Sequence, residues 1–299
     1  MRVCYFTNVY PTPSATTVRR EIFALAALGV DVVRVAARPF KGALVEPADL
    51  AEAPKTRYLT RSIPYAAACL AVVAATRPIR LARAILDALK IGPRTKSGVW
   101  KHLMYLGEAC VLLRITRNCA HIHANFGNAT GIAIMCRILG GPPVSLRIHG
   151  PYEFMDFTPP EWNWKVSHAV FVAPISEFGA QRIRALVEPR FHFKIKLLRC
   201  GVDINFLQSV DNSFSSLPAH HRLVCVARLE PEKGHDILME AIAALRRNGL
   251  SVSVMIIGDG ILRGRLLRHA QKLSISDAVE FVGWRSGDEV IDAMKSHVW

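Results

Sequence analysis

The 299-residue chain is long enough for about two domains, and its 51% hydrophobic and 21% charged residues exclude a disordered, collagen-like or small disulfide-rich protein. Lys and Arg number 38 against 24 Asp and Glu, a net charge of +14. Residues 1–150 carry 20 basic and 7 acidic side chains (+13), and residues 151–299 carry 18 and 17 (+1). This asymmetry predicts that the first half faces a polyanion or an anionic surface.

The cysteine pattern and the apolar runs favour a cytoplasmic protein with no membrane span. The seven cysteines are odd in number and include no Cys-x-x-Cys pair, which is typical of reduced core thiols. They are Cys4, Cys69, Cys110, Cys119, Cys136, Cys200 and Cys225. The N-terminus leaves no room for the apolar core of a signal peptide, and the longest apolar stretch, 63–75, is shorter than the ~20 residues of a spanning helix.

Strand-like and helical runs alternate along the first two thirds of the chain, a pattern that favours a parallel sheet with helices on both faces. Gly29 is expected to end the first helix. A basic helical region is expected from 65 to 117, with a break near Gly92. The expected strands are 3–9, 31–36, 120–124, 144–149, 169–174 and 196–199, and the other helices include 18–28, 130–139 and 177–186.

A polar, Ser-rich segment at 206–221 predicts a linker between domains 1–205 and 222–299. After it the alternation restarts, with strands expected at 222–227, 252–258 and 278–283 and helices at 236–248, 262–273 and 288–295. Three strand signals are fewer than the five or six of a usual doubly wound sheet. The sequence therefore predicts an α/β protein of two Rossmann-like doubly wound domains, the second incomplete.

The sharpest motif is the loop from Arg228 to Gly234, which joins an apolar strand to a helix. Ligands bind at this edge of an open parallel sheet, and a helix N-terminus there offers unpaired amides to an anion. Arg228 and Lys233 could neutralise a diphosphate and stabilise it as a leaving group. The alternative is an ordinary solvated loop with surface charges.

Two further signals are weaker. Gly258-Asp259-Gly260 resembles a nucleotide-binding turn but equally fits a plain tight turn. His149 is expected at the carboxyl end of a strand, and His121 and His123 at the end of another, as functional or as structural residues. No Cys or carboxylate cluster accompanies these histidines, so no metal is expected.

Together these stretches resemble the retaining family-4 glycosyltransferases, which have the two-Rossmann GT-B fold. The matching features occur in the family's order over nearly the whole chain. They are the strand and loop through 10–17, His149-Gly150, 174–177, 201–203 with Phe206, Arg228-Leu229 with Lys233-Gly234, 258–260 and 279–283. The Ser/Thr-containing stretch 14–22 is most similar to members that build bacterial exopolysaccharides such as colanic acid.

The resemblance implies transfer of a sugar from a nucleotide diphosphate donor to an acceptor hydroxyl, with retention and without a metal. The C-terminal domain would hold the donor, with the diphosphate on Arg228 and Lys233. His149 would contact the donor sugar as the catalytic residue. The other implied positions are Gly258, Gly260, Val282, Trp284 and Arg285 for the nucleotide, and Ser14, Thr16 and Thr17 in the acceptor-side loop.

The acceptor implied by the resemblance is a saccharide or a polyprenyl-diphosphate-linked sugar, handled at the anionic inner leaflet of the membrane. The basic first half fits such a surface, because each clustered cation near it contributes ~1 kcal/mol. A nucleic-acid partner is not expected, since no stacking or recognition motif occurs.

The family's paired glutamates, eight positions apart, should follow the strand at 279–283, and the chain ends at Trp299 before that point. The pairs Glu153/Glu161 and Glu232/Glu240 have this spacing in the wrong places. We therefore expect a C-terminally truncated enzyme with an incomplete donor pocket. The alternative is a non-catalytic GT-B remnant that binds a partner or a membrane surface.

Overall fold

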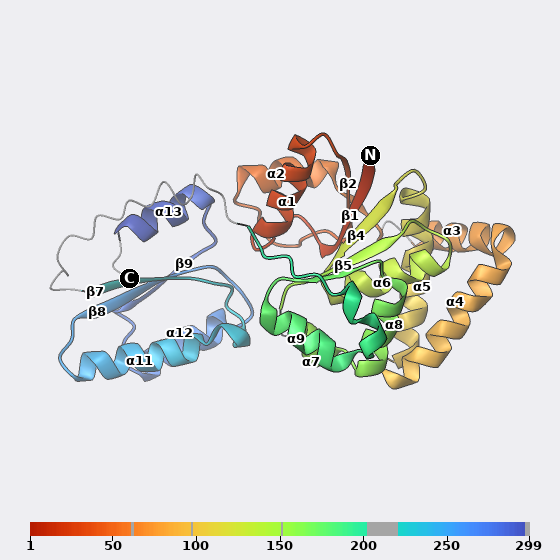
Figure 1. Ribbon diagram of the computed structural model, residues 1–299. Helices are drawn as coiled ribbons and strands as arrows, with labels where there is room; N and C mark the ends of the chain where they lie inside the picture. The colour runs from red at the N-terminus through yellow and green to blue at the C-terminus, as the bar shows by residue number, and fades with distance from the viewer. Residues whose placement is uncertain (61–62, 97, 151, 202–220, 297–299) are drawn as a thin grey trace. The chain divides into compact units, whose positions relative to one another are not determined.

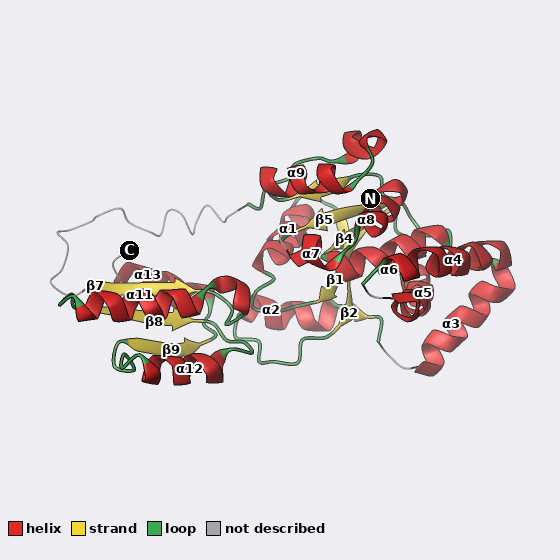
Figure 2. Cartoon of the chain, turned by 90° about the horizontal axis from the view of Figure 1, so that it is seen from below, coloured by secondary structure: helices red, strands yellow, loops and turns green. Residues whose placement is uncertain are grey.

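The computed structural model describes residues 1–60, 63–96, 98–150, 152–201 and 221–296, which fall into two compact units (Figure 1). Unit 1 comprises 1–43 and 51–201, and unit 2 comprises 44–50 and the described residues from 221 onward. Each unit is built on a parallel sheet, shown in yellow in Figure 2. The α/β class predicted from the alternating runs is confirmed.

Unit 1 contains a six-stranded parallel sheet in the order β3-β2-β1-β4-β5-β6. The chain builds outward from β1 in one direction and then returns to build from β4 in the other. The reversal places a topological switch point between β1 and β4, where the loops at the carboxyl ends diverge and leave room for a ligand. The strands are Arg2–Val9, Asp31–Arg38, Arg57–Tyr58, His121–Asn125, Val144–Ile148 and Val172–Pro174.

The two faces of this sheet are covered by different helices, because alternate residues of a strand point to opposite sides. Cys4 and Phe6 of β1 belong to the larger core, which also contains the buried faces of α5 and α6. Tyr5 belongs to a smaller core with Val18 and Ile22 of α1. The helices of unit 1 are α1 Thr16–Ala27, α3 Ile63–Thr76, α4 Pro78–Ile91, α5 Gly98–Ile115, α6 Gly127–Ile138, α7 Tyr152–Asp156, α8 Pro159–His168 and α9 Glu177–Leu186.

Unit 2 contains a three-stranded parallel sheet, β7-β8-β9, within the described residues. Its core combines Leu229, Met239, Ile256 and Leu266. The strands are His221–Val226, Val252–Ile257 and Val279–Gly283, and the helices are α11 His235–Arg247, α12 Arg263–Lys272 and α13 Gly287–Ser296. α2, Pro47–Glu52, lies at the junction of the two sequence segments assigned to different units.

Two sequence predictions are corrected by the fold, and a third, the linker, is left almost untested. The strand expected at 196–199 is not a regular strand: Lys196 and Leu198 donate backbone hydrogen bonds to β6 but complete no ladder beyond it. The helical region 65–117 has a second break, at Arg77, because Pro78 cannot continue a helix. The expected linker lies outside the described residues except for His221, which begins β7.

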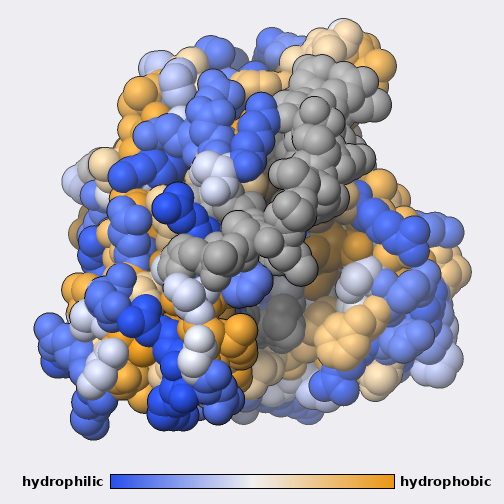
Figure 3. All heavy atoms as spheres, turned by 90° about the vertical axis from the view of Figure 1, so that its left-hand side faces the viewer, coloured by the Kyte–Doolittle hydropathy of each residue, from blue (hydrophilic) through white to orange (hydrophobic). Residues whose placement is uncertain are grey.

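The surface carries scattered large apolar side chains, and Figure 3 shows hydrophilic and hydrophobic residues interspersed on one face. Five of the seven cysteines are buried, whereas Cys200 is exposed and Cys225 is half-buried. Within the described residues, no helix combines the length and the apolar character needed to cross a bilayer.

Candidate functional site

His149 follows β5 at the carboxyl edge of the sheet in unit 1. Its Nε2 lies 2.9 Å from Oδ1 of Asn125, the last residue of the neighbouring β4, and its ring stacks on Phe126 at 4.3 Å between centroids. Burial, together with the charge of Arg147, lowers the pKa of His149 to about 4. The lowered pKa favours a neutral imidazole at pH 7, which can offer hydrogen bonds but no charge.

The turn after His149 is closed by the buried carboxylate of Glu153, which stood out in the sequence only for its spacing from Glu161. Oε2 of Glu153 accepts hydrogen bonds from the backbone N–H groups of His149 (2.7 Å) and Gly150 (3.2 Å). Burial raises the pKa of Glu153 to about 7, although these hydrogen bonds act in the opposite direction. Glu153 therefore holds the backbone at His149 and Gly150 through two hydrogen bonds.

Glu161, the partner of Glu153 in the coincidental pair, also lies in this region and binds a buried lysine. Lys165 Nζ is 3.1 Å from Oε1 of Glu161, and both side chains are almost fully buried. Burial lowers the pKa of Lys165 to about 8, while Glu161 and Glu153 act to raise it. Losing either member of this pair would leave a buried charge without its partner.

A second buried network ties α1 to the same edge. Arg147 of β5 is fully buried and binds Oε1 of Glu21 at 2.8 Å, and Tyr5 donates its hydroxyl hydrogen to the other oxygen of Glu21. Nε and Nη1 of Arg147 have no hydrogen-bond partner. The sequence signal was present, since an arginine inside the apolar strand 144–148 needs a buried counter-ion.

The predicted acceptor-side residues lie in the loop and first turn that follow β1, beside the switch point. Ser14 is exposed and its Oγ lies 3.1 Å from Oγ1 of Thr12. Thr16 and Thr17 open α1 and are partly buried. The residue before them, Ala15, provides no side-chain cap, so the first-turn amides of α1 receive no side-chain oxygen there.

The sequence predicted His121 and His123 at the end of a strand, but they lie in its first half. His121 is the first residue of β4 and His123 is the third. Nε2 of His121 and Nδ1 of His123 each lie 2.7 Å from Oγ of Ser145. Burial lowers the pKa of both, that of His123 to about 3. Among the residues that the structure describes, no three His, Cys, Asp or Glu side chains are grouped so as to hold a metal ion.

In unit 2, the loops after β7, β8 and β9 are hydrogen-bonded to one another. Leu229 N donates to Asp259 O (3.1 Å) and Leu262 N donates to Leu229 O (3.0 Å). Gly258 N donates to Gly283 O (2.9 Å). These bonds bring the expected diphosphate loop, the Gly-Asp-Gly turn and the end of β9 together at one sheet edge.

Gly258 and Gly260 are required by this interlocking. A Cβ added at Gly258, where φ is +136°, would lie 2.1 Å from Ala227 O, and one added at Gly260 would lie 2.6 Å from Leu229 O. No side chain fits at either distance. Their role in binding a nucleotide stays a prediction.

Arg228 and Lys233 both lie on the surface of this edge. The Arg228 side chain is 43% exposed and pairs with Glu232 at 3.0 Å and more loosely with Glu230 at 3.8 Å. Exposed pairs of this kind contribute about 0–1 kcal/mol, so they hold the Arg228 side chain only weakly. Lys233 ends a short 3-10 turn, before Gly234 adopts a left-handed conformation with φ of +66°.

At the end of β9, Val282 and Trp284 are partly buried and Arg285 is exposed. Arg285 donates to Trp284 O at 3.0 Å and lies 3.6 Å from Oε1 of Glu289. The sequence did not single out Arg263, which opens α12 beside the same edge and approaches Phe281 O (3.4 Å).

His235, the first residue of α11, was also not singled out. It is 1% exposed, and neither ring nitrogen has a hydrogen-bond partner. Burial lowers its pKa, which favours the neutral form behind the Arg228–Lys233 loop. The motif segment 202–206 lies outside the described residues.

Comparison with known proteins gives consistent matches. Residues 216–298 match the family model Glycosyl transferases group 1. Over 97% of the chain and 72% of the relative, the sequence is 26% identical to the putative colanic acid biosynthesis glycosyltransferase WcaL of Salmonella typhimurium. A 102-residue stretch is 29% identical to a GDP-mannose-dependent phosphatidylinositol monomannoside mannosyltransferase of Mycobacterium tuberculosis, covering 32% of this chain and 26% of that one.

Two solved structures show the same fold at low sequence identity. Anabaena Alr3699/HepE in complex with UDP-glucose matches with a TM-score of 0.62 and 13% identity, covering 95% of this chain and 69% of that chain. Sucrose-phosphate synthase from Thermosynechococcus elongatus matches with a TM-score of 0.64 and 14% identity, covering 99% and 74%.

Proposed function

Because this chain carries a group 1 glycosyl transferase domain and has the GT-B fold, we propose that it transfers a sugar from a nucleotide diphosphate donor to an acceptor hydroxyl with retention at the anomeric carbon. Relatives named for colanic acid biosynthesis support a role in surface-polysaccharide synthesis. The bound UDP and UDP-glucose of the similar Anabaena structures support a nucleotide sugar as donor.

The observation that carries the proposal is the interlocked edge of unit 2. Its hydrogen-bonded loops carry Arg228 and Lys233, and the existing partners of Arg228 are weak enough to be exchanged for phosphate oxygens. A guanidinium and an ammonium would neutralise the charge that develops on the departing diphosphate. The two cations would supply the stabilisation that a divalent metal provides elsewhere, so we expect donor binding to survive chelation with EDTA.

The remaining nucleotide contacts are assigned by their place at this edge. Gly258 and Gly260 are assigned by their place in the turn after β8, where their missing side chains admit the backbone of the loop that carries Arg228. The half-buried Val282 and Trp284 offer apolar surface for a base, and the exposed Arg285 offers a cation beside them.

In unit 1, His149 is proposed to hydrogen-bond the donor sugar through its neutral ring. With the proton on Nε2, His149 donates to Asn125 Oδ1, which leaves Nδ1 as an acceptor for a sugar hydroxyl. Glu153 would hold the backbone of His149 in place, because its carboxylate accepts hydrogen bonds from the N–H groups of His149 and Gly150. Ser14, Thr16 and Thr17 are proposed to contact the acceptor beside the switch point.

The acceptor is proposed to be a saccharide or a polyprenyl-diphosphate-linked sugar, and the place of action the inner face of the plasma membrane. The 20 basic against 7 acidic side chains in residues 1–150 support a peripheral association with an anionic surface.

The test is calorimetric titration of the full chain with UDP-glucose and GDP-mannose, followed by assay of donor consumption with and without acceptor. The double variant Arg228→Gln/Lys233→Gln should bind the better donor about ten- to a hundredfold more weakly, because it loses two charge-assisted contacts. Arg247→Gln/Lys272→Gln removes the same charge near the far ends of α11 and α12 and should bind like the wild type. Equal binding by all three proteins would contradict the assignment.

A further inference from the structure

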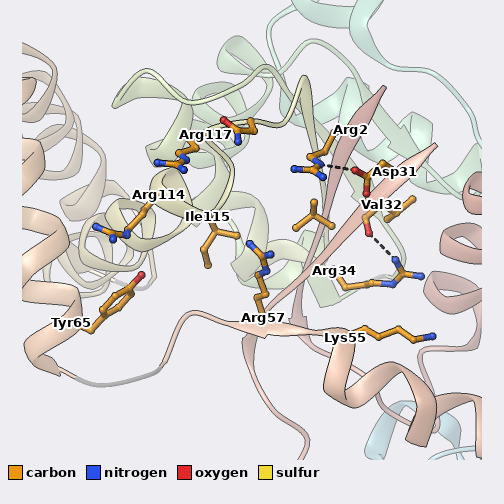
Figure 4. Close-up of a pocket in the computed structure, with 12 residues that line it drawn as sticks. Arg2, Asp31, Val32, Arg34, Lys55, Arg57, Tyr65, Arg114, Ile115 and Arg117 are labelled. Carbon is orange, nitrogen blue, oxygen red and sulfur yellow. Dashed lines mark hydrogen bonds and ion pairs between the residues drawn. The ribbon is translucent and has the colours of Figure 1, made fainter. Parts of the chain in front are cut away.

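Unit 1 contains a polar recess at the sheet edge opposite His149. It has a volume of about 720 Å³ and lies where β1, β2 and β3 begin and α5 ends (Figure 4). Carboxyl ends of parallel strands share one edge, so this recess at the amino ends is separate from the switch point. Its charged lining contains one carboxylate, Asp31, and the cations Arg2, Arg34, Lys55, Arg57, Arg114 and Arg117.

Half of these cations already have carboxylate partners. Asp31 binds Arg2 at 2.6 Å. The buried Glu52 binds Arg34 at 2.9 Å and Lys55 at 3.3 Å. Figure 4 shows Arg34 and Lys55 on the side of the recess away from Arg114 and Arg117.

The other three, Arg57, Arg114 and Arg117, are exposed and form no ion pair within the described residues. They come from β3, from the last turn of α5 and from the loop after it. Arg114 also lies over the ring of Tyr65, at 5.9 Å from its centroid, which limits the freedom of its side chain.

The local backbone does not neutralise this cluster. The end of α5 contributes about half of a negative charge, against three guanidinium groups that repel one another. An anion that contacts all three removes that repulsion, and guanidinium groups match phosphate oxygens through paired hydrogen bonds. We propose that this recess is an anion-binding site for a phosphate group or phosphate pair carrying at least two negative charges.

Two sources could present this chemistry, a free diphosphate or the phosphates of a lipid surface. The lipid source is included because α3, which contributes Tyr65 to the recess, has no charged residue and buries only Cys69 and Val73 among its 14 residues. Ile63 and Val72 of this helix are exposed. An apolar helix beside a phosphate-binding recess suits the headgroup region of a bilayer.

The test measures binding of inorganic pyrophosphate by calorimetry, and flotation with vesicles of phosphatidylcholine containing 30% phosphatidylglycerol or none. All proteins carry Arg228→Gln/Lys233→Gln, so the proposed donor site contributes nothing and the result is independent of that proposal. In this background the triple variant Arg57→Gln/Arg114→Gln/Arg117→Gln is compared with its parent. Its thermal unfolding should be unchanged, because the three side chains are exposed.

A matched control removes three exposed arginines elsewhere, Arg182, Arg247 and Arg268, in the same background. We expect the recess variant to lose about tenfold or more of the affinity for one of the two probes, with the control close to its parent. Loss of pyrophosphate binding identifies a free diphosphate as the source, and loss of flotation restricted to phosphatidylglycerol identifies the lipid. Binding of both probes that falls equally in the control and the recess variant, or no binding of either probe, would overturn the proposal.

Discussion

Replacing Glu153 by Gln tests whether the turn that holds His149 contains a desolvated carboxyl group. In the unfolded chain this group has an ordinary pKa near 4.5, and in the folded chain its pKa is about 7. Between these values the folded state binds more protons than the unfolded state. The stability of the wild type therefore falls as the pH rises from about 4.5 to 7.

The size of the effect on stability follows from the two pKa values, 4.5 in the unfolded chain and about 7 in the fold, because each pKa unit corresponds to about 1.4 kcal/mol. A side chain that stays neutral would not lose this stability. Compared with it, the ionisable carboxyl lowers the free energy of unfolding by about 1 kcal/mol at pH 5 and by about 3 kcal/mol at pH 7.5. Gln keeps an oxygen for the N–H groups of His149 and Gly150, and its amide replaces an oxygen that has no partner. Any free-energy cost of burying that amide group is the same at both pH values, because Gln does not ionise.

Glu153→Gln should therefore gain about 2 kcal/mol on the wild type between pH 5 and pH 7.5. The assay is urea unfolding followed by the fluorescence of Trp162 and Trp164, which are buried in α8 of unit 1. Glu177→Gln, at an exposed position in α9, is the control and should show no such change. An unfolding free-energy difference that is equal at both pH values would show that Glu153 ionises normally in the fold, and would refute the reasoning.

Three further changes probe the two edges. Gly258→Ala should destabilise unit 2 by about 2–4 kcal/mol in thermal unfolding, because the added Cβ clashes with Ala227 O. Its control, Gly249→Ala, has φ +83° but open space around it, and should cost about 1 kcal/mol. Glu21→Gln should cost about 3 kcal/mol by leaving Arg147 charged and buried, and the double variant with Arg147→Met should recover most of this loss in urea unfolding. His149→Ala should weaken donor binding in calorimetry with little change in the unfolding midpoint, since the ring is half-buried. Unchanged donor affinity would exclude the sugar contact.

The sequence predicted where β7 and β8 of unit 2 end, although not the hydrogen bonds between their loops, because both signals for the strand ends are local. An apolar run ending before Arg228, and glycines flanking Asp259, mark where strands end regardless of the rest of the chain. The helix at 177–186 was predicted with its observed bounds, and the Ser176 hydroxyl accepts from Gly179 N at its start. Caps of this kind are written in the sequence.

Other features were missed, either because the local signal was ambiguous or because they depend on contacts between distant residues. The helix α8 begins with Pro159 and Pro160. Two prolines in a sequence usually indicate the end of a helix or a loop, but proline is also favoured in the first turn of a helix, so the signal was ambiguous. The strand expected at 196–199 has strand-like composition but lies at the open side of β6, where only one neighbour is available. The raised pKa of Glu153 arises from burial that no local pattern reports.

The charge of the first half illustrates the same difference between composition and structure. Several of its arginines are committed to internal partners: Arg147 to Glu21, Arg77 to the carbonyls at the end of α6, and Arg34 to Glu52. Such cations add to the net charge but have little affinity left for a ligand, because binding one would break an existing pair. A polyanion is therefore expected to bind where the partners are missing, at the amino edge of the sheet, rather than wherever Lys and Arg are most frequent in the sequence.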